Sequence, residues 1–225
     1  RLDTFSQFDI QTNIFSARRN FNLDENYFSF FNLEDAVFAP NINFLRVVLN
    51  RAEILQSIRT SLDYSGQLDN GSSMLFSYYK DAKAFDTSSQ KNGHLTGISF
   101  GQSFVGMGSQ ALIGYKLSIE NYRANAKYEY FENYGIEFSY AKPLGNNWQF
   151  SSKYSWQDKT HDDDYPLFGD RHDQLEALRF NLLKPYGSCW AFNFGMVFSD
   201  SKSTINIYKR RSNNFTAQVN YQCFK

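Results

Sequence analysis

The sequence predicts an all-β protein, a transmembrane, antiparallel, up-and-down β-barrel of about twelve strands (roughly ten to fourteen). From 147 to 157 and from 188 to 199, every second residue is large and mostly aromatic, and small polar residues lie between. Such period-2 alternation indicates strands with one apolar and one polar face. The aromatic positions are Trp148, Phe150, Tyr154 and Trp156, then Trp190, Phe192, Phe194, Met196 and Phe198.

Composition supports a barrel with an apolar outside and a wet inside. Aromatic residues make up 18% of the 225 residues, yet only 20% are charged, and the mean hydropathy is −0.53. A large soluble β-sandwich is the alternative, but it would carry more charge outside. The zero net charge argues against a nucleic-acid partner. No apolar run is long enough for a transmembrane helix, and barrel strands need none.

The connections between the expected strands alternate in length. Short ones with Gly, Pro or Asn lie at Gly66–Gly71, Val105–Met107, Pro143–Asn146 and Pro185–Gly187, which is hairpin-turn chemistry. Long polar ones are expected at about 82–92, 159–173 and 200–213. Outer-membrane barrels have short periplasmic turns and long extracellular loops. The strands are expected at 4–16, 26–38, 42–50, 54–66, 72–81, 93–104, 108–119, 128–142, 147–158, 174–185, 188–199 and 214–224.

These features predict a location in the bacterial outer membrane. Because the expected strand count is even, both the N-terminus and the C-terminus are expected in the periplasm. Residues 1–225 are interpreted as a single barrel domain. The chain begins at Arg1 without an initiator methionine, so it is expected to be a processed mature form or a domain cut from a longer protein. In the second case an N-terminal periplasmic domain would be missing from this chain.

Charged residues within the strands alternate with the aromatic set and should point into the barrel. Either these charges pair across strands and stiffen the wall, or they form a polar track for a translocating substrate. The first interpretation is favoured. The expected lumen-facing residues are Arg59, Asp63, Lys116, Glu137, Lys153 and Arg179, and the expected lipid-facing ones include Ile98, Phe100, Ile113, Leu117, Phe138 and Phe194.

Two cysteines, Cys189 and Cys223, begin and end the last expected hairpin. At the same end of that hairpin they could form a disulfide in an oxidising compartment such as the periplasm. Their positions fall on opposite faces in strict alternation, so the bridge would need frayed ends or a bulge.

Groups for catalysis or metal binding are few. The histidines are His94, His161 and His172, and no GxSxG, HExxH, P-loop or CxxC motif is present. The run from His161 to Asp164 could bind a divalent cation, but a solvated acidic loop is the more common case and the spacing matches no calcium loop. The expectation is a protein that is not an enzyme and holds no cofactor or metal.

Two segments resemble a known family. Tyr165–Asp173 and Ser203–Arg210 each lie in a long expected loop, and together with the Tyr-rich strands between 128 and 156 they resemble the C-terminal barrel of the surface lipoprotein assembly modifier family. That resemblance implies an outer-membrane protein that helps to move lipoproteins to the cell surface, usually with a periplasmic tetratricopeptide region. It implies that Phe168, Gly169, Arg171, Asp173, Asn206 and Tyr208 organise the extracellular face. Alternatively, these loops pack into the lumen and plug it.

The functional hypothesis is therefore a translocation conduit or assembly factor for a macromolecule, a surface lipoprotein by the resemblance. Its partners would be the lipid bilayer, the translocated lipoprotein or polysaccharide, and a periplasmic partner domain. The alternatives are a porin-like diffusion channel for small solutes, an exopolysaccharide export pore, and a structural or adhesive surface barrel without transport.

Overall fold

The chain forms one antiparallel, up-and-down β-sheet of twelve strands. The structure is a computed structural model, and it describes residues 10–23, 33–49, 52–106, 110–187 and 189–221. Within these ranges no helix is long and apolar enough to cross a membrane. The strands are β1 (Ile10–Arg18), β2 (Phe21–Asn22), β3 (Leu33–Leu49), β4 (Ala52–Leu68), β5 (Ser73–Ala84), β6 (Gly93–Val105), β7 (Leu112–Ala124), β8 (Phe131–Pro143), β9 (Gln149–His161), β10 (His172–Tyr186), β11 (Trp190–Ser203) and β12 (Arg210–Tyr221).

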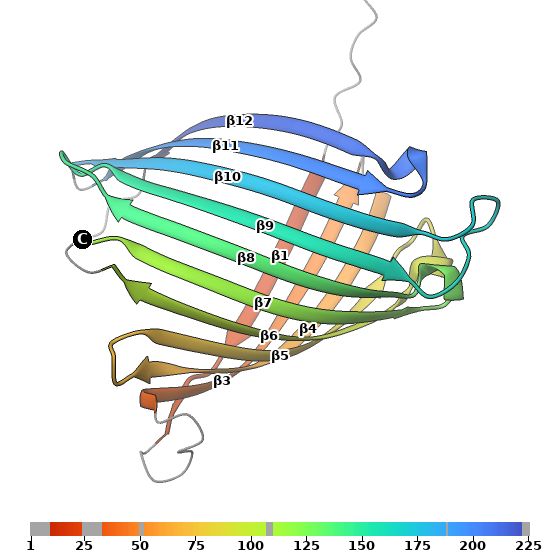
Figure 1. Ribbon diagram of the computed structural model, residues 1–225, viewed down its shortest axis with the longest axis horizontal. Coiled ribbons are helices and arrows are strands. Elements are labelled where there is room, and N and C mark those ends of the chain that lie inside the picture. Colours follow the sequence, from red (N-terminus) through yellow and green to blue (C-terminus); the bar gives the residue numbers. More distant parts are fainter. Residues whose placement is uncertain (1–9, 24–32, 50–51, 107–109, 188, 222–225) are drawn as a thin grey trace, which may run out of the picture.

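The sheet is open but curved, and this shape is compatible with a barrel. Its order is β1, β3, β4 and then every strand in sequence to β12, while β2 pairs only with β3. Figure 1 shows the sheet curling so that β1, β3 and β4 lie behind β6 to β12. Among the described residues β1 and β12 are not paired with each other.

The N-terminal strands differ from the sequence prediction. The described parts of the two strands expected at 26–38 and 42–50 form one strand, β3, that runs through Pro40. Residues 26–32 and 50 of those expected strands, and residues 4–9 of the strand expected at 4–16, lie outside the described residues. The break near Pro40 is in the neighbouring strand instead, because β1 ends and β2 begins there along the same edge of β3. β1 ends at Arg18 opposite Asn41, and β2 begins at Phe21 opposite Phe38. The amide of Arg19 donates to the Pro40 carbonyl (3.2 Å), so Pro40 turns its donor-less nitrogen to the same edge. Proline is tolerated at such an edge, because no ladder hydrogen bond is lost in the interior.

The antiparallel register sorts side chains onto two faces of the sheet. Directly opposed residues share a face, so Ser99, Ser118, Gly135 and Gln157 form one polar row across β6 to β9. The next row along, Phe100, Leu117, Ile136 and Trp156, is apolar. The alternation predicted from the sequence is therefore carried across the strands as two continuous surfaces.

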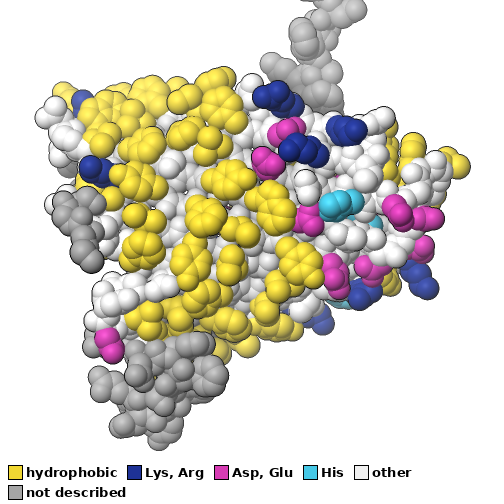
Figure 2. Space-filling view, in the orientation of Figure 1, with side chains coloured by type: hydrophobic (Ala, Val, Ile, Leu, Met, Phe, Trp, Pro, Cys, Tyr) yellow, Lys and Arg dark blue, Asp and Glu magenta, His cyan; other side chains and the backbone are white. Residues whose placement is uncertain are grey.

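The apolar surface is the convex one. Figure 2 shows apolar side chains gathered over the middle of the outer face, with most charged side chains toward one end. Phe138 and Phe194 remain 55% and 48% exposed on this face. None of the large described side chains is fully buried, so the sheet has no packed core of the kind that a sandwich would have. The small buried clusters are Tyr79, Leu95, Tyr122 and Ala124, and Leu33, Ala36 and Met74.

The two ends of the sheet differ. At one end, called the turn end here, the connections are 69–72, 106–111, 144–148 and 187–189. Asn146 and Asn147 both have positive φ angles (59° and 62°), which is the two-residue turn that suits a twisted hairpin. At the opposite end, called the loop end, the connections are 85–92, 125–130, 162–171 and 204–209. Three of these contain short 3₁₀ helices, η2 (Ser89–Lys91), η3 (Lys127–Glu129) and η4 (Asn206–Tyr208).

The difference in connection length is smaller than the sequence predicts. The long connections expected at 82–92, 159–173 and 200–213 shorten to 85–92, 162–171 and 204–209, because the polar strand ends continue their pairing beyond the apolar band. The link between β3 and β4 at the loop end, residues 50–51, lies outside the described residues. The chain termini, expected on one side of the membrane, also lie outside them.

If the convex face meets lipid, as the sequence predicts, a charge placed on it should prevent insertion into a membrane. Phe180 lies in the apolar row with Met196 and Phe215, whereas Arg179, its neighbour in sequence, lies in the polar row with Lys153. An Arg on a lipid-facing position costs about 2–4 kcal/mol at the midplane. We expect Phe180→Arg to abolish the heat-modifiable gel migration of the folded protein in detergent, and Arg179→Ala to retain it. The reverse result would show that the two faces have been assigned the wrong way round.

Candidate functional site: the polar concave wall and the loop cap

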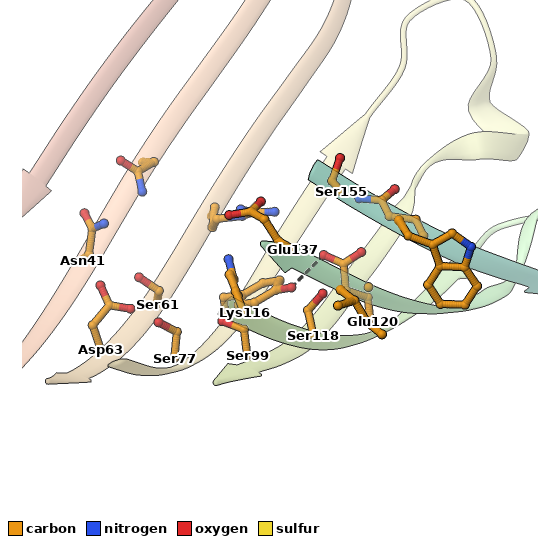
Figure 3. A pocket seen from close by; sticks show the side chains of 17 residues that line it. Asn41, Ser61, Asp63, Ser77, Ser99, Lys116, Ser118, Glu120, Glu137 and Ser155 are labelled. Atoms are coloured by element: carbon orange, nitrogen blue, oxygen red, sulfur yellow. Dashed lines mark hydrogen bonds between the residues drawn. The ribbon is translucent and has the colours of Figure 1, made fainter. Parts of the chain in front are cut away.

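The concave face carries a polar groove of about 320 Å³. Its walls are mostly hydroxyl, amide and charged side chains from β3 to β9, and Gly135, Ile136 and Trp156 also line it. Figure 3 shows the labelled side chains projecting from successive strands toward one shared space. The residues that define the groove are Asn41, Asn43, Arg59, Ser61, Asp63, Ser77, Tyr79, Ser99, Lys116, Ser118, Glu120, Glu137, Ser155 and Gln157.

All six residues expected to face a lumen lie on this concave face. Arg59, Asp63, Lys116 and Glu137 line the groove directly. Lys153 forms an ion pair with Glu137 (2.7 Å), and Arg179 is directly opposite Lys153 in the register. The sequence pattern therefore identified one continuous surface.

One network joins the strands through Tyr79. The Tyr79 hydroxyl on β5 donates to Glu120 on β7 (2.6 Å), and Asn133 on β8 donates to the other Glu120 oxygen (2.8 Å). The Arg59 guanidinium on β4 lies over the Tyr79 ring (4.8 Å to its centre). Side chains therefore connect β4 to β8 across the concave surface.

This network depends on Gly97. Gly97 on β6 is opposite both Tyr79 and Glu120, so the Tyr79 side chain must cross it to reach Glu120. A Cβ atom at Gly97 would lie 2.5 Å from the Tyr79 ring. The ring therefore fills the space that a side chain would otherwise occupy.

A second network centres on Asp81, which the sequence reasoning did not single out. Its side chain is 5% exposed and lies 3.5 Å from the Arg59 guanidinium and 3.9 Å from the Lys83 ammonium. The Ser57 hydroxyl donates to it. The signal available in the sequence was its alternation with Ser77 and Tyr79 on β5.

The wall combines paired and unpaired charges. Glu137, Lys153, Arg59 and Asp81 are paired. Within the described part of the chain, Asp63, Lys116 and Arg179 form no ion pair. Both sequence interpretations thus have a counterpart: cross-strand pairs that stiffen the wall, and charges that face the groove.

Side chains from three connections at the loop end and from the start of β10 form a second cluster, called the loop cap here: Glu129, Tyr165, Arg171, Asp173 and Tyr208. The Tyr208 hydroxyl donates to the Tyr165 hydroxyl (2.8 Å), which donates to Glu129 on η3 (3.1 Å). The Arg171 guanidinium stacks on the Tyr208 ring (3.6 Å) and lies near that of Tyr165 (5.3 Å). Burial, together with the neighbouring Glu129 carboxylate that accepts its hydrogen bond, raises the pKa of Tyr165, so this phenol stays protonated.

Asp173 anchors the loop cap to the sheet. Its carboxylate accepts from Arg171 (2.9 Å) and from the Ser203 hydroxyl (2.6 Å). The buried His161 ring lies 3.7 Å from the same carboxylate and contacts the Tyr128 carbonyl through Nδ1 (3.1 Å). The Asp173 carboxylate therefore lies between the Ser203 hydroxyl and the His161 ring. A catalytic serine needs the imidazole next to its own hydroxyl, so these three residues are not arranged as a catalytic triad.

The motif residues predicted for the loops meet here in part. Arg171, Asp173 and Tyr208 belong to the loop cap, and Gly169 closes the Tyr165 turn with a φ of 75°. Phe168 is 52% exposed beside Tyr165, and Asn206 accepts a hydrogen bond from Lys209 at the surface (2.7 Å). Glu129 and Ser203 were missed, because they lie outside the two segments or at their edge.

The remaining candidates do not converge. Asp162 pairs with Arg123 (2.9 Å), while its neighbour His161 points to Asp173. No group of three or more His, Cys, Asp or Glu side chains among the described residues is arranged to hold a metal. His94 shares the convex face with Ala82 and Arg123, and His172 pairs with Asp158 (2.7 Å).

Cys189 is disulfide-bonded, and no described cysteine is a free thiol. Its expected partner, Cys223, lies outside the described residues.

Comparison with known proteins adds no assignment. No protein-family model matches the sequence, and a search of the curated proteins finds no match. The resemblance of the two loop segments thus stays a hypothesis, to be judged on the geometry of the loop cap and the groove.

Removing Arg171 should loosen the loop cap far more than removing a surface arginine. Arg171 and Asp173 side chains are only 13% and 15% exposed, and breaking such a pair leaves a buried charge that costs about 3–5 kcal/mol. We expect Arg171→Ala to make the 162–171 loop a new site of limited proteolysis. Arg123→Ala breaks an exposed pair, worth about 0–1 kcal/mol, and serves as control. Equal protease resistance of both variants would contradict the role given to Arg171.

Proposed function

We propose that this chain forms the barrel wall of a bacterial outer-membrane protein that passes, or helps to assemble, a macromolecule at the cell surface, with a surface lipoprotein as the substrate. The observation that carries the proposal is the pairing of two surfaces on one curved sheet. An apolar convex band suits lipid, and a concave wall of hydroxyls, amides and mixed charges suits water and a moving polar chain.

The chemistry of the groove favours passage over tight binding. One row across β5 to β8 consists of three serines and a glycine, Ser77, Ser99, Ser118 and Gly135, and these small residues leave space beside the backbone. Arg59 and Glu137 are ion-paired within the wall and the Glu120 carboxylate accepts hydrogen bonds from Tyr79 and Asn133, so a passing polypeptide meets many hydrogen-bonding groups and few charges without a partner. An extended polypeptide can exchange one hydrogen bond with this wall for another as it moves, because each bond contributes little net free energy. No single position along the groove then holds the polypeptide tightly.

The loop cap supports the link to lipoprotein assembly. The two segments that resemble the surface lipoprotein assembly modifier family are the ones that supply Tyr165, Arg171, Asp173 and Tyr208 to the loop cap. Contacts between three connections hold them in a defined arrangement at one end of the sheet. A porin-like channel for small solutes and a non-transporting surface barrel would not need these particular segments to converge.

Removing the free charges of the groove should impair display of the lipoprotein. Asp63→Ser with Lys116→Ser leaves the net charge unchanged and breaks no ion pair of the described residues, yet it removes from the groove wall two charges that form no ion pair there. We expect several-fold less lipoprotein at the cell surface, measured by antibody labelling of intact cells, with the barrel amount unchanged. Lys142→Ser, at an exposed convex position near the turn end, is the control. If the amount of displayed lipoprotein is unchanged both in this double variant and after deletion of the whole gene, the translocation proposal is wrong.

Ion conductance in planar bilayers distinguishes a diffusion channel for small solutes from the proposed conduit. Glu137→Gln would leave Lys153 next to Arg179 without its counter-charge. In a small-solute channel this change should shift ion selectivity in planar bilayers toward anions, since the wall gains positive charge. For a conduit that is closed at rest, we expect no steady conductance from either protein. Steady conductance whose selectivity responds to Glu137→Gln would favour the diffusion channel.

A further inference from the structure

The sheet has two edge strands, β1 and β12, and the direction in which they run limits which strand can pair with them to close the sheet. Each of the strands from β3 to β11 pairs on both sides, whereas β1 pairs only with β3 and β12 only with β11 among the described residues. If the chain crosses a membrane as proposed above, these edges cannot stay open, because lipid offers no partner to backbone N–H and C=O groups.

Both edges run in the same direction. β12 starts at Arg210 at the loop end and finishes at Tyr221 at the turn end. β1 starts at Ile10, opposite Leu49 at the loop end, and finishes at Arg18, opposite Asn41. Direct pairing of β1 with β12 would therefore be parallel, whereas every strand pair of the described sheet is antiparallel.

A second copy cannot supply an antiparallel neighbour either. Two copies inserted in one membrane with the same orientation present edges that all run from the loop end to the turn end. Any pairing between those edges would again be parallel. A partner strand that runs the other way, from the turn end to the loop end, keeps every pair of the sheet antiparallel, as in the described sheet.

We propose that one further strand of the same polypeptide, preceding β1, closes the sheet by pairing antiparallel with both β12 and β1. The chain enters β1 at the loop end, which is where a strand of the required direction finishes. From β3 to β12, neighbours in the sheet are also neighbours in sequence, so the strand before β1 is expected beside it.

The exposure of the edge side chains fits a missing neighbour. Phe15 on β1 and Phe215 on β12 are 69% and 68% exposed, more than Phe138 and Phe194 within the sheet. The closing strand should be about ten residues long. Its apolar side chains should join the row of Phe215 and Val219, and its polar ones the concave side with Thr216 and Gln218.

Photo-crosslinking from the β12 edge tests the proposal. Thr216→benzoylphenylalanine is placed in the polypeptide as cells produce it, and the linked peptides are identified by mass spectrometry after irradiation. We expect a link to a peptide of the same polypeptide that precedes Ile10. The control is Asn193→benzoylphenylalanine on β11, which should link only to β10 or β12. With that control positive, a link from position 216 to residues 10–18, a link to another polypeptide, or no link would each overturn the proposal.

Disulfide formation gives an independent reading of the same gap. With a strand between them, β1 and β12 lie two strand spacings apart, about 10 Å, beyond the reach of a disulfide of about 7 Å between Cα atoms. Gln218→Cys combined in turn with Thr12→Cys, Ile14→Cys and Ser16→Cys should form no bridge. Gln218→Cys with Asn193→Cys, which are opposed in the register, should form one. A disulfide between β1 and β12 would show that these two strands pair directly and would refute the additional strand. If the protein itself is absent from the outer-membrane fraction, the proposed function is refuted instead.

Discussion

The alternation of side chains along a pleated strand is the constraint from which the rest of this structure follows. Antiparallel pairing places directly opposed residues on the same face, so an alternation set in each strand extends across the whole sheet. A shift of one residue in any pair would turn that strand's charges to the apolar side. The rows that contain Ser118 and Leu117 stay polar and apolar from β6 to β9 without such a shift. Groove, convex band and loop cap all rely on this register.

Small residues give the concave wall its shape. Gly97 allows one aromatic ring to lie across β6 and reach β7, and Gly135 leaves room beside the Ser118 hydroxyl, which a Cβ would meet at 2.5 Å. A wall of larger side chains would fill the space that the groove now occupies. Polar networks then bind the strands from the inside, where an ordinary domain would use a packed core. This division explains how a sheet with few fully buried residues can hold a defined arrangement of charges.

Sequence reasoning identified the β-class, the strand number, the two faces and the six concave charges, because all of these depend on local alternation. It placed a break at Pro40 where the structure has a continuous strand, since a proline's effect depends on which neighbour its nitrogen faces. It missed Asp81 and Glu129, whose importance comes from partners far along the chain. Strand ends were also misplaced, because polar residues that read as loops continue the hydrogen-bonded ladder at the loop end.

The strand order also has a kinetic meaning. From β3 to β12 every strand pairs with its sequence neighbours, so each hairpin closes a short loop and loses little chain entropy. Such a sheet can grow one hairpin at a time. Closing the sheet, as proposed above, is different, since a strand before β1 has to meet β12 far along the chain at a larger entropic cost. Assembly should thus be fast along the sheet and slow at that last pairing, and this is the step where a cellular assembly machine would contribute most.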